Sequence, residues 1–192
     1  MAKKAVRHFS CVIGFDDAPF PAGYEGDVKV VGTVYAGLRL DGILVGEVTK
    51  DGLDAAEKLA ALVQQSKFAP NLHLIMLQGI ALGGFNVVDV FALHSQLDLP
   101  ILVVSRRLPD TEAIRDALLT AIPGGPEKWA VIEQLGPMEP AGPVYVQRVG
   151  LTLEQATTVV KRLAVEGSLP EPLRVAHLIA GAIVEGQSRG RA

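Results

Sequence analysis

Residues 28–66 read VKVVGTVYAGLRLDGILVGEVTKDGLDAAEKLAALVQQS, and within this stretch the hydrophobic pattern changes from that of strands to that of a helix. The segments 28–40 and 43–49 are rich in valine and flank Asp41-Gly42, which is a two-residue signal for a type I′ hairpin. After the second segment, apolar residues recur at helical instead of strand spacing. The stretch therefore predicts an antiparallel strand pair that leads directly into an α/β segment.

The rest of the chain extends this pattern in both directions. A helix is expected over 54–66, where Asp54 and Glu57 form a candidate capping box. Further strands are expected at 11–16, 72–77, 101–105 and 144–149, and further helices at about 86–96, 111–122, 153–165 and 169–185, the last two opened by Thr152 with Gln155 and by Ser168 with Glu171. Alternating strands and helices require parallel strands joined by right-handed crossovers. Three antiparallel strands followed by a parallel β-α-β-α segment is the element order of the ribonuclease-H-like mixed sheet, an α/β fold with helices on both faces.

The composition is that of a globular protein. The 192 residues are 49% hydrophobic and 20% charged, and we expect a single domain over 1–192. The net charge of -3 gives no overall basic field, so a nucleic-acid partner would have to bind a local basic patch. The only cysteine, Cys11, excludes an intrachain disulfide and agrees with a reducing cytoplasm. The basic residues 1–8 precede only five apolar residues, too few for a signal peptide, and no apolar stretch reaches the ~18 residues of a membrane span.

Acidic or amide side chains follow several of the expected strands. Asp16 and Asp17 end the first strand, Asp51 follows the third, Gln78 follows the fourth, and Asp89 comes a few residues later. The first and fourth strands are neighbours in this fold, so Asp16 and Gln78 should lie side by side, and the third strand should bring Asp51 to the same edge. Oxygen donors of this kind suit Mg²⁺ or Mn²⁺, with Asp16, Asp51 and Asp89 as candidate metal ligands. The chemistry that this pattern predicts is metal-assisted transfer at phosphorus.

Each acidic residue also has a purely structural interpretation. Asp16 and Asp17 precede Ala-Pro and could shape a turn, since aspartate accepts hydrogen bonds from backbone amides two residues on. Asp51 precedes a glycine and could be a turn residue. Asp89 lies three residues after Asn86 and could belong to a helix cap.

Basic residues near the same edge could contact phosphate oxygens. Arg106 and Arg107 follow the fifth expected strand, on the side where Asp16 ends the first. Arg174 and His177 lie one turn apart on the last expected helix, where Glu171 can share their face. His177 also lies near an apolar stripe and could be a buried packing residue, and the two arginines could be a solvated pair.

Five separated segments resemble those of a prokaryotic family of unassigned function that is grouped with endonuclease V in the ribonuclease-H-like superfamily. They are GFDDAPF (14–20), KDGLDAAEKL (50–59), GIALGGFNVVD (79–89), PILVVSRRLPD (100–110) and GSLPEPLRVAHLIAGAIVEG (167–186). Resemblance to endonuclease V implies a Mg²⁺-dependent cut near deaminated purines in DNA or RNA, with the aspartate that ends the first strand as a metal ligand. Asp16 matches that position. The resemblance also implies an aspartate after the fourth strand, where this chain has Gln78, and a late basic residue that supports the metal site.

Two functions remain open on the sequence. The first is a divalent-metal-dependent nucleic-acid phosphodiesterase, in which Asp16, Asp17, Asp51 and Gln78 form the site and Arg106, Arg107 or Arg174 holds phosphate. The second is a non-catalytic nucleic-acid-binding or regulatory protein with a degenerate metal site, which the neutral Gln78 and the acidic net charge favour. In both cases DNA or RNA is the expected partner, Mg²⁺ or Mn²⁺ the expected cofactor, and the cytoplasm the expected location.

Overall fold

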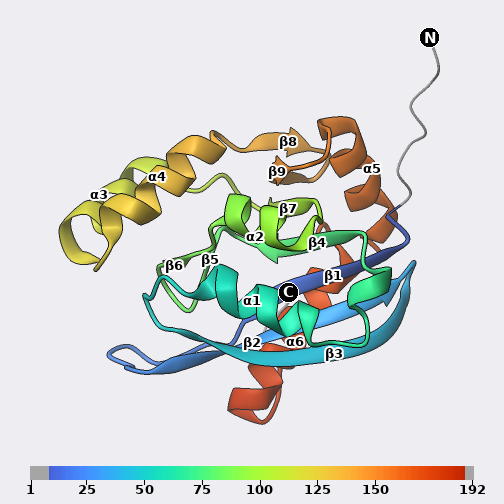
Figure 1. The fold of residues 1–192 in the computed structure, drawn as a ribbon, viewed down its shortest axis with the longest axis horizontal. Helices are drawn as coiled ribbons and strands as arrows, with labels where there is room; N and C mark the ends of the chain where they lie inside the picture. The colour runs from blue at the N-terminus through green and yellow to red at the C-terminus, as the bar shows by residue number, and fades with distance from the viewer. Residues whose placement is uncertain (1–8, 189–192) are drawn as a thin grey trace.

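The computed structural model describes residues 9–188, and its centre is a mixed sheet with helices on both faces (Figure 1). The strands of the sheet are β1 (Cys11–Asp17), β2 (Asp27–Ala36), β3 (Arg39–Thr49), β4 (Leu74–Gln78), β7 (Ile101–Ser105), β8 (Glu139–Ala141) and β9 (Val144–Val149). Across the sheet they follow the order β3-β2-β1-β4-β7-β9-β8. A separate two-stranded sheet consists of β5 (Ala81–Leu82) and β6 (Asn86–Val87).

The strand directions confirm the fold expected from the sequence. β1, β2 and β3 pair antiparallel in turn, whereas β4 pairs parallel with both β1 and β7. β9 closes the other side of the sheet by pairing antiparallel with β7. Because β3 runs in the same direction as β1, the carboxyl ends of β1, β3, β4 and β7 all lie at one edge of the sheet.

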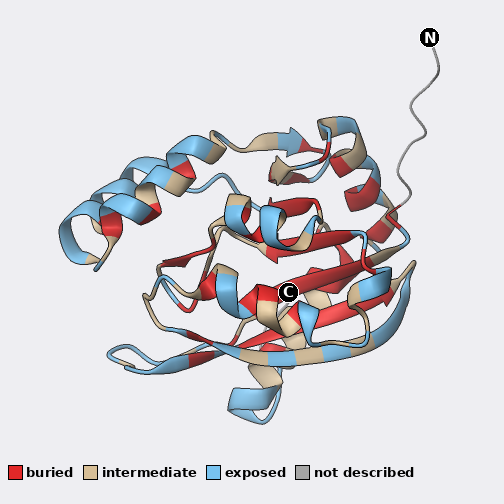
Figure 2. Cartoon of the chain, viewed as in Figure 1, coloured by how far each residue is buried: buried red, intermediate tan, exposed pale blue. Residues whose placement is uncertain are grey.

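Helices cover both faces of this sheet, and each face has its own hydrophobic core (Figure 2). The helices are α1 (Ala55–Gln64), α2 (Val90–Leu97), α3 (Thr111–Ala121), α4 (Gly125–Leu135), α5 (Leu153–Leu163) and α6 (Glu171–Glu185), with a 3-10 turn at Ala69–Asn71. α1 and α2 pack on one face through Leu59, Val63 and Leu93. α5 and α6 cover the other face, and α3 and α4 form a pair beside β6. No helix among residues 9–188 is long and apolar enough to cross a membrane, and the basic segment 1–8 lies outside the described residues.

The hairpin between β2 and β3 turns four residues earlier than predicted. Ala36 pairs with Arg39, so the turn is Gly37-Leu38 and not Asp41-Gly42. Gly37 has φ +62, the left-handed conformation that a tight hairpin turn requires. Gly42 is needed for a different reason, because a Cβ there would lie 2.1 Å from the ring of Phe68. The glycine of Asp41-Gly42 is therefore required for packing inside β3 and does not form the turn.

Two of the three predicted capping boxes are wrong. Thr152 and Gln155 form the expected box at the start of α5. The Asp54 side chain makes no cap, and Asn86, distant in sequence, instead accepts the first free amide of α1, from Ala55, at 3.1 Å. α6 starts after Pro170 without any side-chain cap.

The segment between β4 and α2 and the segment after α3 also differ from the prediction. The helix expected from residue 86 begins at Val90, because Asn86 and Val87 pair with β5 instead. α4 was not predicted, and its start at Gly124 and Gly125 has the composition of a turn.

Candidate active site at the carboxyl ends of the central strands

Asp16 lies at the centre of the candidate site. It is next to last in β1 and is 4% exposed, packed under α6. The Nδ1 atom of His177, from α6, donates a hydrogen bond to Asp16 Oδ2 at 2.7 Å. Burial raises the pKa of the Asp16 carboxyl, although the hydrogen bond from His177 opposes this effect. The same hydrogen bond raises the pKa of His177.

Asp17 ends β1 and turns toward the loop that follows β4. Its Oδ2 atom accepts a hydrogen bond from the backbone amide of Gly83 at 2.9 Å. Burial first, and the charge of Asp16 second, raise the pKa of Asp17 to about 6. The two adjacent carboxyl groups thus disfavour each other's ionised form, which a bound cation would reverse.

Gln78 lies beside the aspartates, as the strand order predicted. The parallel register of β1 and β4 ends with Phe15 opposite Leu77, which makes Gln78 the neighbour of Asp16. Asp16, Asp17, Gln78 and His177 line one cavity of about 580 Å³. The Gln78 Oε1 atom is buried and has no hydrogen-bond partner among the described residues. Such an acceptor is available to a cation or to a ligand donor.

Asp51 does not line that cavity. It follows β3 with φ +51, and its Oδ1 atom accepts a hydrogen bond from the amide of Phe85 at 2.7 Å. Its Oδ2 atom lies 3.0 Å from Lys50 Nζ, and this ion pair and the Phe85 amide keep its pKa below the usual range although burial opposes them. Asp51 therefore holds the loop whose Gly83 amide reaches Asp17, so its contribution to the site is indirect.

Asp89 is also engaged elsewhere. Its Oδ1 atom accepts hydrogen bonds from the amides of Phe91 and Ala92 at 3.1 and 2.9 Å, which makes it the N-cap of α2. The structural interpretation of Asp89 accounts for its side chain, and it lines none of the cavities at the sheet edge.

The arginines are divided between two places. Arg106 and Arg107 leave β7 and line a second cavity of about 510 Å³ together with Gln78. Arg106 is close enough to lower the pKa of Asp16. Arg174 lies apart, with its guanidinium held by both carboxylate oxygens of Glu171 at 2.7 and 2.8 Å. That ion pair satisfies Arg174 within α6.

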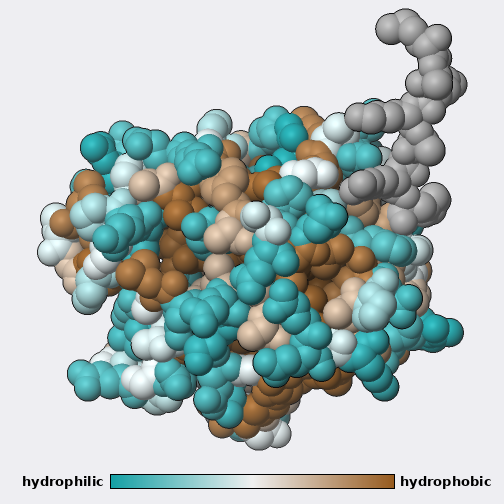
Figure 3. Space-filling view, viewed as in Figure 1, coloured by the Kyte–Doolittle hydropathy of each residue, from teal (hydrophilic) through white to brown (hydrophobic). Residues whose placement is uncertain are grey.

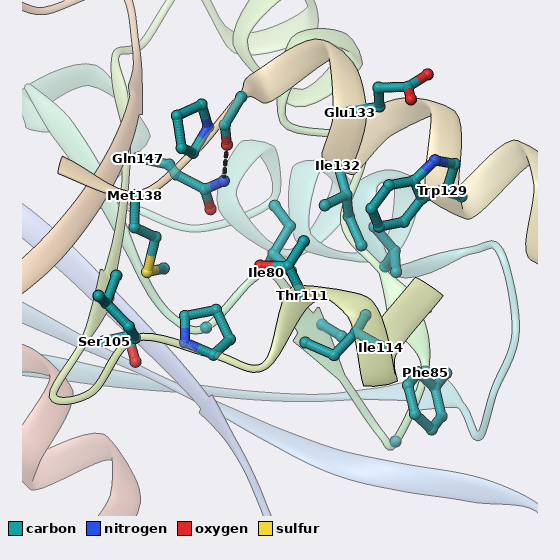
Figure 4. Close-up of a pocket in the computed structure, with 18 residues that line it drawn as sticks. Ile80, Phe85, Ser105, Thr111, Ile114, Trp129, Ile132, Glu133, Met138 and Gln147 are labelled. Carbon is teal, nitrogen blue, oxygen red and sulfur yellow. Dashed lines mark hydrogen bonds between the residues drawn. The ribbon is translucent and has the colours of Figure 1, made fainter. Parts of the chain in front are cut away.

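A third, larger cleft of about 820 Å³ adjoins the arginines and was not foreseen from the sequence. Its walls are the loop after β4, the start of α3, and α4 with the segment that follows it, and it shares Gly79 and Ser105 with the second cavity (Figure 4). Trp129, Met138 and Phe85 make it largely apolar. Apolar surface gathers where the α3–α4 pair meets the rest of the molecule (Figure 3). The first and second cavities share Gln78, and the second and third share Gly79 and Ser105, so the three lie in a row along the edge where the parallel strands end. We call this row the crevice.

The donor set suits a single divalent cation. Asp16 and Asp17 provide carboxylate oxygens, and Gln78 provides an unpartnered amide oxygen on the same cavity. Hard oxygen donors of this kind match Mg²⁺ or Mn²⁺. Residues 9–188 contain no group of three or more His, Cys, Asp or Glu side chains arranged to hold a metal, so water or substrate oxygens would have to complete the shell.

His177 is the site residue whose role the sequence did not settle. Its spacing from Leu173 and Ala180 favoured a packing role, but it faces the end of β1. α6 approaches that strand closely because Gly14 has no side chain, and a Cβ there would lie 2.6 Å from Pro172. The glycine in GFDD was the available signal, although it does not indicate which helix packs there.

The strand order defines an α/β protein with the ribonuclease-H-like fold, which is also the fold of endonuclease V. Endonuclease V from Ciona intestinalis, in complex with a DNA containing an inosine followed by a ribo-adenosine, superposes with a TM-score of 0.57 at 15% identity, covering 87% of this chain and 82% of that one. Endonuclease V from Bacillus subtilis gives a TM-score of 0.57 at 11% identity, over 92% and 81% of the two chains. At these identities the similarity is one of fold.

The family itself follows from closer matches. The model of the family described as endonuclease dU matches residues 9–184, and the chain belongs to that family. A UPF0215 protein from Deinococcus radiodurans is 50% identical over 188 residues, which cover 98% of this chain and 96% of the relative. A protein of unknown function from Archaeoglobus fulgidus has a solved structure that is 37% identical, with a TM-score of 0.85 over 92% of this chain and 99% of the other.

Proposed function

We propose that this protein is a divalent-metal-dependent endonuclease that cuts a phosphodiester of DNA or RNA. The observation that carries the proposal is the adjacent pair of buried Asp16 and half-buried Asp17 beside the unpartnered oxygen of Gln78, in a cavity that adjoins Arg106 and Arg107. Buried carboxyl groups with raised pKa values are typical of functional sites. The name of the family and the fold of endonuclease V support the same class of reaction.

The roles of the residues follow from their positions. Asp16, Asp17 and Gln78 would hold Mg²⁺ or Mn²⁺, and a bound cation supplies Lewis-acid polarisation of the phosphate. His177 fixes the Asp16 carboxylate through its hydrogen bond, and the Gly83 amide fixes Asp17. Arg106 and Arg107 are placed to meet phosphate oxygens next to the aspartates.

The adjoining apolar cleft supports recognition of a base. A base taken out of the stack is held between apolar or aromatic side chains, and the cleft shares Gly79 and Ser105 with the arginine cavity. The family description points to deoxyuridine, so duplex DNA containing one deoxyuridine is the first substrate to test.

Cleavage of that duplex tests the proposal. We expect cutting with Mg²⁺ or Mn²⁺, none in EDTA, and a loss of at least about a hundredfold in Asp16→Asn, since one ligand of the reacting site is removed. Asp89→Asn is the matched control, because asparagine still caps α2 and the site is untouched. Equal loss in both variants, or cutting in EDTA, would contradict the proposed site.

A second candidate is a binding protein without catalysis. It is favoured by Gln78, a neutral residue where a carboxylate would hold a second cation more firmly. Binding of the duplex that persists in EDTA, without cutting under any metal condition, would support this candidate.

A further inference from the structure

The apolar cleft contains one deeply buried polar side chain, that of Gln147. This residue lies in the middle of β9, opposite Val103 of β7, and is 7% exposed. The other polar side chains of the lining, from Ser105, Thr111 and Glu133, are more exposed. A buried amide in an apolar cleft costs stability unless both its donor and its acceptor are satisfied.

The orientation of the Gln147 amide is fixed by its neighbour. Its Nε2 atom donates a hydrogen bond to the backbone carbonyl of Gly136, which can only accept. The amide nitrogen must therefore face Gly136, and the Oε1 atom points into the cleft (Figure 4). No described residue donates a hydrogen bond to that oxygen. Among the buried side chains that line the cleft, Gln147 thus presents an acceptor that is aimed into it.

The surroundings of this acceptor suit a flat ring. Trp129 and Ile132 of α4 lie on one side, and Ile80 and Met138 approach from others (Figure 4). Aromatic and thioether side chains contact the faces and edges of planar rings favourably. A ligand that fills the cleft and satisfies the acceptor is therefore planar, largely uncharged and carries an N–H donor at its edge.

We infer that Gln147 is the specificity-determining residue of the cleft, where its side-chain oxygen accepts a hydrogen bond from the ring N–H of a nucleobase in the keto form, such as N3–H of uracil. This inference rests on the proposed function, in which the cleft receives a base. Uracil carries a proton on N3, whereas cytosine has a lone pair there that would face the Gln147 oxygen. A base that lacks the N3–H donor would leave the Gln147 oxygen unpaired when it binds, and this strongly lowers its affinity relative to uracil. We therefore expect the cleft to select uracil, the deaminated base, over cytosine, from which it is formed.

The protein contains a single tryptophan, Trp129, and it lines this cleft. Its fluorescence can therefore report occupancy in EDTA, without any metal or cleavage. We expect 2′-deoxyuridine to change the emission, and 2′-deoxycytidine and N3-methyl-2′-deoxyuridine to bind at least about tenfold more weakly, which corresponds to about 1.4 kcal/mol. The methylated nucleoside tests the N–H in the unaltered protein, so the result does not depend on how a variant folds.

Two variants complete the test. Gln147→Leu should lose the preference for 2′-deoxyuridine over 2′-deoxycytidine, whereas Gln134→Leu, the same substitution at an exposed position of α4 outside the cleft lining, should keep it. Equal affinity of the parent protein for the three nucleosides, or no response to any of them at millimolar concentration, would overturn the inference. A preference that survives in Gln147→Leu would overturn it too. Discrimination by Trp129 fluorescence in a protein that does not cut DNA would leave the inference standing and reject only the proposed cleavage.

Discussion

At the scale of single residues, the site is defined by two adjacent carboxyl groups, that of the buried Asp16 and that of the half-buried Asp17. Asp16 receives a hydrogen bond from the His177 side chain, whereas Asp17 receives one from the backbone amide of Gly83. Burial and the neighbouring charge raise the pKa of Asp17 to about 6, from an ordinary value of 3.8. The Asp17 carboxyl therefore loses its proton less readily in the folded protein than in the unfolded chain. Ionisation of Asp17 therefore opposes folding.

The consequence for stability has a definite sign. The folded state binds the Asp17 proton more tightly than the unfolded chain, so the free energy of unfolding should fall as pH rises from about 4 to about 6, by up to roughly 3 kcal/mol. Asp17→Asn cannot ionise and keeps an oxygen for the Gly83 amide. We expect this variant to be more stable than the parent by about 1–3 kcal/mol near neutral pH, measured by urea unfolding across a pH series without metal.

The raised pKa of His177 adds a fall in the same direction above about pH 6.5, but this second fall should occur in both proteins. The difference between the two profiles therefore reports the ionisation of the coupled Asp16–Asp17 pair. Parallel profiles in the parent and in Asp17→Asn would show that Asp17 ionises normally and that the pair is not strained.

At the scale of elements, α4 is tied to the loop after β3 by a buried lysine. Lys128 is 1% exposed, and its Nζ atom donates hydrogen bonds to the carbonyls of Asp51 and Pro123 at 2.6 and 2.8 Å. The Asp51 carboxylate in turn accepts from Phe85, two residues from the Gly83 amide that holds Asp17. The wall of the apolar cleft and the aspartate pair thus share one support.

Replacing Lys128 tests this support. Lys128→Met keeps most of the side-chain length but leaves two carbonyls without their donor, so we expect a loss of about 2–4 kcal/mol in the free energy of unfolding. Lys58→Met, at an exposed position on α1, should change it by no more than about 0.5 kcal/mol. Urea unfolding measures both. Similar small effects in the two variants would mean that water replaces the Lys128 ammonium group at little cost.

The elements differ in how far the sequence could predict them. The strands at 101–105 and 144–149 were predicted to the residue, because short valine-rich runs lie between proline or glycine breaks. The hairpin turn was displaced because Gly37 and Gly42 both fit a turn locally, and only the packing of Phe68 against Gly42 separates them. α4 was missed because its first residues are those of a turn.

The residues of the candidate site also differ in how far the sequence could predict their positions. The neighbourhood of Asp16 and Gln78 followed from strand order alone, since adjacent parallel strands must end together. His177, Lys128 and Gln147 could not be placed in this way, because each acts through contacts between elements that are distant in sequence. For Asp51, the strand pattern predicted the correct edge of the sheet, but the hydrogen bond from the Phe85 amide that engages its carboxylate is a tertiary contact.

At the scale of the whole molecule, a net charge of -3 must be reconciled with an anionic partner. The crevice provides local positive charge for such a partner, since Arg106 and Arg107 line the cavity between the aspartate cavity and the apolar cleft. Each phosphate neutralised by a basic side chain releases counterions, which makes affinity depend on salt. With few basic residues at the crevice, that dependence should be shallow and should rest largely on these two arginines.

Removing both arginines tests where the nucleic acid binds. Arg106→Ala/Arg107→Ala should weaken binding of a labelled duplex at least about tenfold and reduce the slope of log affinity against log salt by about one to two units. Fluorescence anisotropy in EDTA over a salt series measures affinity without cleavage. Arg39→Ala is the control, because Arg39 begins β3 at the opposite edge of the sheet and pairs with Asp41. If the double variant keeps both affinity and slope, the phosphates bind elsewhere, and Arg174, freed from Glu171, becomes the next residue to test.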